Sequence, residues 1–248
     1  MSFIDLFSGH ADRYAEARPR YPEELFAFIA SQAPARTRAW DCGTGNGQAA
    51  ASLAGHFAAV FATDPSEEQI GHAVQIANVH YSVQPAEVTN LPARSMQAIC
   101  VAQALHWFDL GAFFTEAQRV AAPGAVFAAW GYTWFAVSPR FDVAFREFVS
   151  DVIAPYWAPQ NKLLWDGYVD VPMPFPRVSA PPFEIQAHWT LPQLLAYVRT
   201  WSAARRCMAE RGTTLFDTAE RKLASTWGAP EEARAVAMPL HLLMGRVP

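Results

Sequence analysis

The stretch Ala39–Ala50, AWDCGTGNGQAA, places a glycine at every second position behind an aspartate. The residues concerned are Asp41, Gly43, Gly45 and Gly47. Glycine has no Cβ atom and adopts positive φ angles at little cost, so alternating glycines allow a sharp turn that a ligand can approach closely. A glycine-rich surface turn without a ligand is the alternative, and the motif alone does not decide between the two.

The surrounding segments alternate between strand-like and helix-like patterns. This alternation predicts an α/β fold, with a mostly parallel sheet that is covered by helices on both faces. Strand, glycine loop and helix follow one another in the order that a cofactor loop requires. The expected strands are 37–41, 58–64, 97–104 and 125–132, and the expected helices are 21–33, 48–57, 66–77 and 113–124.

A second aspartate stands at the end of the second expected strand. Asp64 follows Asp41 at about the 20-residue offset at which a strand-end carboxylate accepts hydrogen bonds from ribose hydroxyls. Taken alone, Asp64 followed by Pro65 and Ser66 is better explained as a turn residue that caps the next helix. Together with the glycine loop, it predicts a bound nucleoside.

The composition excludes several classes of protein. The chain has 248 residues, 52% of them hydrophobic, which is enough to bury a large core. A net charge of −4 provides no basic field for a phosphate backbone, so we expect no nucleic-acid partner. No leader-like segment and no long uncharged apolar run occurs, which predicts a cytoplasmic protein without a membrane partner. The widely spaced Cys42, Cys100 and Cys207 indicate neither disulfides nor a metal site.

The second half of the chain departs from the simple alternation. An amphipathic helix is expected over 139–157, followed by an extended loop over 169–183 that contains five prolines. A sixth strand over 183–191, a helix over 191–212 and a closing strand over 236–246 complete the chain, and Pro239 in that last strand argues for an edge or a bulge.

These motifs together resemble the class I S-adenosylmethionine-dependent methyltransferases. The resemblance rests on Asp41 with its three glycines, on Asp64, and on Ala86–Glu87 within QPAEVTNLP. Four further segments are similar to the small-molecule subgroup that contains trans-aconitate methyltransferase-like proteins: YAEARPRYP (14–22), AQALHWFD (102–109), RVAAPGAVFAAWGY (119–132) and YVRTWSA (197–203). The similarity is good over 10–135 and loose beyond it.

The resemblance implies a fold and a division of the chain. It implies a Rossmann-like sheet of seven strands with an antiparallel last strand and a helical cap inserted after the fifth strand. We expect a single domain, 1–248, which is monomeric or homodimeric. Its expected parts are an N-terminal lid and helix (1–35), a cofactor-binding core (36–136), a cap insertion (137–182), and C-terminal strands and helices (183–248).

The resemblance also implies S-adenosyl-L-methionine as the cofactor and assigns residues to it. Asp41 would contact the methionine ammonium, Asp64 the ribose diol, and Glu87 the adenine amino edge. Arg18 would reach the cofactor carboxylate from the lid, although a plain surface arginine is an equal alternative. The full expected set is Arg18, Asp41, Cys42, Gly43, Gly45, Asn46, Gly47, Asp64, Pro65, Ile70, Glu87 and Gln103.

The methyl acceptor is expected beside the strand ends, because ligands of open α/β sheets bind outside the carboxyl ends of the strands. The expected acceptor-binding residues are Tyr14, His106, Trp107, Tyr132 and Trp201. For a hydroxyl or amine acceptor, His106 is a candidate catalytic base, as is Tyr14, whereas a structural role for His106 is the alternative. For a carboxylate acceptor no base is needed, and the site needs cations such as Arg18, Arg140, Arg205 or Arg206.

Three hypotheses follow for the function. The first is methyl transfer from S-adenosylmethionine to a small molecule, with a carboxylate or hydroxyl oxygen as the acceptor. The second is a protein that binds S-adenosylmethionine or its demethylated product without catalysis. The third is an oxidoreductase with a nucleotide cofactor, which the sequence disfavours because Gln48 occupies the position of the third glycine of the GxGxxG fingerprint. Nine tryptophans, most of them in the later half, suggest an aromatic-lined acceptor pocket or, alternatively, a tryptophan-rich core.

Overall fold

A single seven-stranded sheet runs through the protein. The computed structural model describes residues 19–248, so Tyr14 and Arg18 lie outside the described residues. The strand order is β3-β2-β1-β4-β5-β7-β6, in which β1 to β5 are parallel and β7 is antiparallel to both of its neighbours. The expected sheet, mostly parallel with an antiparallel last strand, is therefore confirmed. The strands are β1 (Arg38–Cys42), β2 (Ala59–Asp64), β3 (Val79–Val83), β4 (Met96–Ala102), β5 (Ala121–Tyr132), β6 (Glu184–Trp189) and β7 (Arg234–Arg246).

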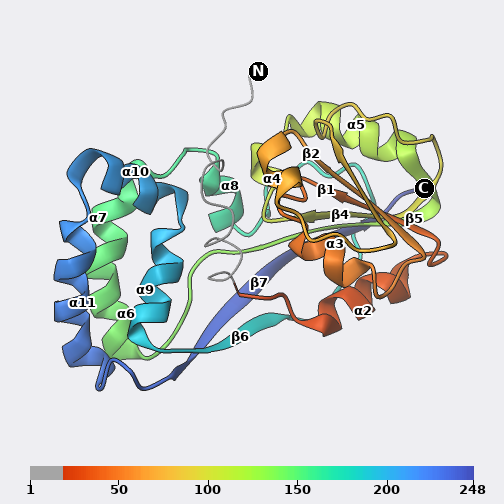
Figure 1. The fold of residues 1–248 in the computed structure, drawn as a ribbon. Coiled ribbons are helices and arrows are strands. Elements are labelled where there is room, and N and C mark those ends of the chain that lie inside the picture. Colours follow the sequence, from red (N-terminus) through yellow and green to blue (C-terminus); the bar gives the residue numbers. More distant parts are fainter. Residues whose placement is uncertain (1–18) are drawn as a thin grey trace.

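Helices cover both faces of the parallel part of this sheet (Figure 1). On one face lie α2 (Glu23–Gln32) and α3 (Gln48–Leu53), and on the other lies α5 (Leu110–Val120). Alternate residues of a strand point to opposite faces, so Phe127 packs in the core on the α5 side while Val126 packs in the core on the α2 side. The short helix α4 (Glu67–Gly71) follows β2.

Most of the remaining helices gather away from the parallel strands and form a helical half of the molecule, whereas α8 (Asn161–Trp165) lies closer to the sheet (Figure 1). They come from two separate parts of the sequence, yet they share one apolar cluster that includes Phe141, Leu194, Phe216 and Trp227. The first part comprises α6 (Pro139–Phe145), a π-helical turn (Arg146–Ser150), α7 (Asp151–Ile153) and a 3-10 turn (Ala154–Tyr156), and it is followed by α8, whose buried Leu164 belongs instead to the cluster under α5. The second part comprises α9 (Leu191–Arg199), α10 (Ser202–Arg211) and α11 (Thr214–Trp227).

Three expected helices have clearly different limits in the structure. The helix expected over 66–77 ends at Gly71, as α4. The helix expected over 191–212 is interrupted, because Trp201 adopts an extended conformation with ψ 140° and α10 starts only after it. The helix expected over 113–124 ends at Val120, because Ala121 already pairs with Met96 of β4 as the first residue of β5. Gly124 then has φ +74° close to a register shift between these two strands.

Pro239 lies at the point where β7 changes neighbours. Residues 234–239 of β7 pair with β6, and residues 240–246 pair with β5. Pro239 lies opposite Glu184, and the next residue, Leu240, donates its N–H to the Phe183 carbonyl. Hydrogen-bonded and non-hydrogen-bonded pairs alternate along an antiparallel ladder, so the missing N–H of Pro239 costs no hydrogen bond to β6. β7 is therefore an inner strand of the sheet as a whole, but at Pro239 it pairs with β6 alone, because its pairing with β5 begins at Leu240.

Candidate functional site

The glycine loop is held at the carboxyl end of β2. The amides of Gly43 and Thr44 both donate to the Thr63 carbonyl, at 2.8 and 2.9 Å. Gly43, Gly45 and Gly47 have φ angles of +69°, +56° and +85°, which side-chain-bearing residues rarely adopt. The conformation therefore requires the glycines that the sequence places there.

Asp41 is a fully buried carboxyl group behind this loop. Its Oδ2 accepts a hydrogen bond from the Thr44 hydroxyl at 2.5 Å, whereas Oδ1 has no partner among the described residues. Burial raises the Asp41 pKa to about 7, because the ionised form loses its hydration. A raised pKa in the folded state means that the contribution of Asp41 to stability is complete below its ordinary pKa and is lost as the pH rises through 7. A cation placed against the unpaired oxygen would stabilise the ionised carboxylate and so offset the free energy that is lost when this buried group ionises.

The carboxylate of Asp64 is hydrogen-bonded both to the glycine loop and to the turn that follows β2. Its Oδ2 accepts from the Gly45 amide and its Oδ1 accepts from the Ser66 amide, each at 2.9 Å. The Asp64 carboxylate thus shapes both the glycine loop and the turn into α4, while the helix itself is capped by Ser66, which accepts from the Gln69 amide. The carboxylate lies beside the glycine loop, and its expected contact with a ribose diol remains a prediction.

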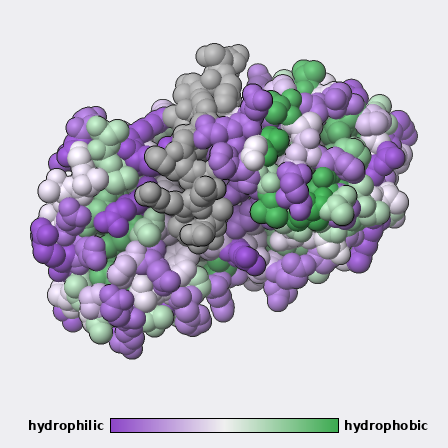
Figure 2. Space-filling model, in the orientation of Figure 1, coloured by the Kyte–Doolittle hydropathy of each residue, from purple (hydrophilic) through white to green (hydrophobic). Residues whose placement is uncertain are grey.

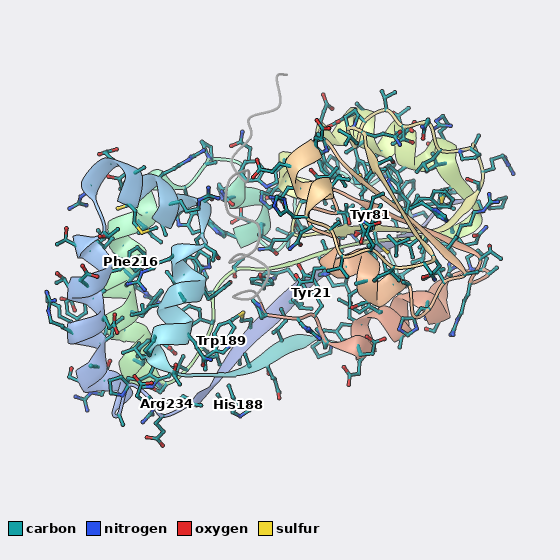
Figure 3. The ribbon with its side chains drawn as sticks, in the orientation of Figure 1. Tyr21, Tyr81, His188, Trp189, Phe216 and Arg234 are labelled. Atoms are coloured by element: carbon teal, nitrogen blue, oxygen red, sulfur yellow. The ribbon has the colours of Figure 1, made fainter. Side chains whose placement is uncertain are left out.

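Tyr81 of β3 lies against the glycine loop and was not found from the sequence. A Cβ atom on Gly47 would collide with the Tyr81 ring and hydroxyl, and this hydroxyl donates to the Val74 carbonyl at 3.1 Å. Burial raises the Tyr81 pKa to about 12, so the phenol stays neutral. Figure 3 shows Tyr81 in the sheet half of the molecule. The contact depends on β3 pairing with β2, which no local pattern indicates.

The remaining expected cofactor residues differ in their surroundings. Cys42 is fully buried, and burial raises its thiol pKa, which makes it unreactive. Glu87 accepts from the Asp109 amide at 3.0 Å and so contacts the first turn of α5. Asn46, Pro65 and Ile70 are partly exposed in the loop, after β2 and in α4. Contacts of these residues with a cofactor remain predictions.

Gln103 joins the ends of β4 and β5. Its amide group donates to the Tyr132 carbonyl at 2.8 Å and accepts from the Tyr132 N–H at 2.9 Å, while its own backbone N–H donates to the Trp130 carbonyl. Gln103 also has φ +55°. The side chain therefore holds the two strand ends together, and its expected contact with the cofactor remains a prediction.

A pocket opens next to this joint. Its lining includes Gln103 and every described residue that the sequence assigned to the acceptor: His106, Trp107, Tyr132 and Trp201. It also includes residues that were not assigned, among them Asn161, Leu164 and Tyr197 from the helical half. The segment that carries His106 also touches the glycine loop, because a Cβ atom on Gly43 would lie 2.8 Å from the Ala104 Cβ and 3.0 Å from the Phe108 ring.

His106 is a neutral, buried histidine at this boundary. Its side chain belongs to a 3-10 turn (Leu105–Trp107) and is 6% exposed, and its Nδ1 has no partner among the described residues. Burial lowers the His106 pKa to about 4, because a charged imidazolium would lose its hydration. The imidazole is therefore uncharged at neutral pH and is able to accept a proton.

The arginines considered for a carboxylate acceptor are not brought to the pocket. None of Arg140, Arg205 and Arg206 belongs to its lining, and Arg206 donates to the Tyr156 carbonyl instead. Arg18 lies outside the described residues. Within 19–248 no helix is long and apolar enough to cross a membrane. In the same range, no group of three or more His, Cys, Asp and Glu side chains could hold a metal ion.

Comparison with known proteins agrees with the class that this fold and loop define. A profile of the methyltransferase domain matches residues 40–129. A Dictyostelium discoideum protein named as a methyltransferase is 32% identical over 204 residues, which is 81% of this chain and 78% of that protein. An uncharacterized methyltransferase of Mycobacterium tuberculosis is 28% identical over 94% of this chain and 91% of its own length.

A solved structure from Anaeromyxobacter dehalogenans, named as a type II methyltransferase, is 41% identical to the chain. The two superimpose with a TM-score of 0.87, covering 93% of this chain and 98% of that one. The chain therefore belongs to the class I S-adenosylmethionine-dependent methyltransferases. The alternative of an oxidoreductase with a nucleotide cofactor is wrong, whereas membership of the trans-aconitate subgroup stays a prediction.

Proposed function

We propose that this methyltransferase transfers a methyl group from S-adenosyl-L-methionine to a hydroxyl oxygen of a small molecule. One observation carries the proposal: the segment 103–108 contacts the glycine loop at Gly43 on one side and lines the pocket on the other. A methyl donor on the loop and an acceptor in the pocket would meet beside this segment, with the acceptor oxygen in direct contact with the methyl group.

The glycine loop and its two aspartates fit the cofactor. Gly45 leaves room for a ligand beside the backbone, since a Cβ atom there would meet only Gln69 Oε1 at 3.8 Å. The unpaired oxygen of the buried Asp41 suits the ammonium group of a methionine moiety. Asp64 lies at the end of β2 beside the loop, hydrogen-bonded to the Gly45 amide, where a carboxylate suits a ribose diol. The bound cofactor would supply an activated methyl group, and the side chains around it would orient the acceptor and exclude water.

A hydroxyl acceptor is favoured over a carboxylate by the charge of the pocket. A carboxylate acceptor would need a cation, and no lysine or arginine among the described residues lines the pocket. A hydroxyl acceptor needs a group that takes its proton, and the neutral imidazole of His106 is such a group. Because the oxygen becomes more acidic as the methyl group bonds to it, even a weak base suffices late in the transfer.

Calorimetric titration tests the cofactor assignment. We expect binding of S-adenosylmethionine and S-adenosylhomocysteine and none of NAD. Asp64→Asn should weaken both by about tenfold or more, because it removes a charged acceptor of the ribose hydroxyls. Glu67→Gln, an exposed acidic residue of α4, is the matched control and should bind as the wild type does. Unchanged affinity of Asp64→Asn would contradict the ribose assignment.

A further inference from the structure

Four tryptophans form a continuous aromatic wall in the pocket. They are Trp134, Trp157, Trp165 and Trp201, which we call the tryptophan wall, and all four line the pocket. Trp157 contacts the other three, with ring centroids 6.4, 5.7 and 5.8 Å away. Trp134 additionally lies 6.2 Å from Trp165 and 5.9 Å from Trp201. The four rings come from different segments: Trp134 follows β5, Trp157 precedes α8, Trp165 ends α8 and Trp201 precedes α10. The wall therefore exists only in the folded chain.

This wall is not simply part of the hydrophobic core. Trp40 and Trp227, which are core residues, are completely buried, whereas Trp134 is 41% exposed and Trp165 is 37% exposed. Exposing two adjacent indole rings forgoes the burial of a large apolar surface. A planar apolar ligand that lies against these rings would bury that surface.

Two polar atoms of the same pocket have no partner among the described residues. These are His106 Nδ1 and Trp157 Nε1, and both atoms are shielded from solvent. A buried polar atom without a partner costs free energy, and in a binding site a ligand commonly supplies the partner. The indole N–H only donates, and a neutral imidazole nitrogen can accept. The complementary ligand therefore carries one hydroxyl donor and at least one oxygen acceptor, and a hydroxyl group provides both functions.

The absence of charged side chains from the described pocket lining limits the charge that the ligand can carry. The described lining residues of the pocket include no aspartate, glutamate, lysine or arginine. An anionic ligand would thus be buried without a cation, and a cationic ligand would have only ring faces and no carboxylate as its partner. An uncharged ligand avoids both costs.

We propose that the methyl acceptor is an uncharged planar aromatic compound that carries a hydroxyl group, which lies against the tryptophan wall with its hydroxyl at His106. This inference rests on the proposed function. In the transfer, a lone pair of the aromatic oxygen forms the new O–CH3 bond while the S–CH3 bond breaks and its electron pair stays on sulfur. The hydroxyl proton passes to His106 Nδ1, and the products are an aryl methyl ether and the thioether S-adenosylhomocysteine.

Calorimetry on the protein saturated with S-adenosylhomocysteine tests this inference by binding rather than by turnover. The probes are three uncharged hydroxyarenes (phenol, 2-naphthol and 7-hydroxycoumarin), the anion 2-naphthoate, the cation benzyltrimethylammonium, and the non-aromatic cyclohexanol. We expect at least one hydroxyarene to bind about tenfold or more tightly than each of the other three probes. The same compound should yield its methyl ether when S-adenosylmethionine replaces the product.

Variants separate the wall from the rest of the helical half. Trp165→Leu removes a partly exposed ring and should weaken hydroxyarene binding about tenfold, with S-adenosylhomocysteine affinity unchanged. Trp189→Leu is the matched control, because Trp189 at the end of β6 packs against the apolar cluster of the helical half (Figure 3) but does not line the pocket, and the variant should bind within about twofold of the wild type. His106→Gln should lower kcat more than it raises KM, because the glutamine side chain can hold the hydroxyl but cannot take its proton.

Three outcomes would overturn the inference. The first is that 2-naphthoate or benzyltrimethylammonium binds more tightly than every hydroxyarene. The second is that no hydroxyarene binds better than cyclohexanol, and the third is that Trp165→Leu binds them as the wild type does. If S-adenosylhomocysteine itself fails to bind, the proposed function fails instead, so the two failures are distinguishable.

Discussion

At the scale of single residues, the carboxyl group of Asp41 has the most direct experimental consequence. It is fully buried with one unpaired oxygen, and burial raises its pKa to about 7. If the ammonium of the cofactor binds there, the ionised carboxylate is stabilised and its pKa falls. Cofactor binding at about pH 6 should therefore release close to one proton, because the free protein carries the carboxyl group largely protonated at that pH.

Titration calorimetry in two buffers of different ionisation enthalpy measures this proton release. Asp41→Asn has no titratable group at this position and should release none at the same pH. Uptake of a proton, or equal release by the variant, would show that Asp41 does not sense the cofactor.

The individual residues of the site differ in how far the sequence predicted them. The spacing of the glycines and of Asp64 is a local property, and the structure places them at one end of the sheet as expected. Tyr81 was missed, since its contact with Gly47 arises only because β3 lies beside β2. The roles of His106 and Gln103 depended on hydrogen-bond partners, which the sequence does not reveal.

At the scale of elements, the joint between β4 and β5 is the part of the sheet nearest the pocket. A Cβ atom on Gly131 would lie 2.6 Å from Gln103 Oε1 and 2.6 Å from Leu164 Cδ1. Gly131→Ala should therefore displace the Gln103 side chain from its hydrogen bonds to Tyr132 and lower the free energy of unfolding by about 1–3 kcal/mol. Urea unfolding followed by circular dichroism measures the change.

Gly71→Ala at the end of α4 provides the comparison for this substitution. No atom lies within 4 Å of a Cβ built there, so the variant should be as stable as the wild type or slightly more stable. If Gly131→Ala has the same stability as Gly71→Ala, the joint tolerates a methyl group and the close packing around Gln103 is not required.

The existence of most elements was predictable, but several of their ends were not. Periodicity indicated a helix before Gly212, and nothing local revealed that Trp201 would adopt an extended conformation and divide it into α9 and α10. The start of β5 at Ala121 likewise depends on pairing with β4 and not on the Pro123–Gly124 pair, which on its own suggests a stop. Pro239 is tolerated for a similar reason, because the change of neighbours along β7 is a property of the sheet.

At the scale of the whole molecule, the apolar core is divided. The two clusters on the faces of the parallel strands are separate from the cluster of the helical half. Figure 2 shows a mostly hydrophilic visible surface, with its largest hydrophobic area over the sheet half. If these clusters unfold together, the chain behaves as the single domain expected over 1–248. That expectation stays a prediction.

A substitution that creates a cavity in one cluster tests whether the two halves of the molecule unfold together. Phe141→Ala removes a completely buried ring of the helical half and should destabilise it by about 3–5 kcal/mol. Hydrogen exchange should then accelerate in α6, α9 and α11 and remain slow in β1 and β4. Mass spectrometry of exchanged peptides gives this readout.

Phe113→Ala, in the cluster under α5, is the reciprocal control. It should accelerate exchange in α5 and β4 and leave α6 and α11 protected. If either substitution accelerates exchange equally in both halves, the clusters unfold as one cooperative unit.

The arrangement of the helical half was the least predictable feature of the fold. The expected cap over 137–182 provides only part of it, because α9 and α11 from beyond that range pack in the same cluster as α6. Amphipathic patterns show that each helix has an apolar face, but they do not show which other helix covers that face. The tryptophan wall combines rings from both parts, which is why its members were only suspected from the sequence.

The position of β7 has a consequence for synthesis on the ribosome. β7 pairs with both β5 and β6, and it is translated after both of them. Until residues 234–246 emerge, β5 presents an open edge and β6 lacks its neighbour in the sheet. Unpaired strand edges are sites of aggregation, so a nascent chain that has made β1 to β6 is at its most vulnerable just before this strand is completed. A chaperone that protects this protein would act at that stage by covering the unpaired edges of β5 and β6. It would be displaced when β7 pairs with both strands.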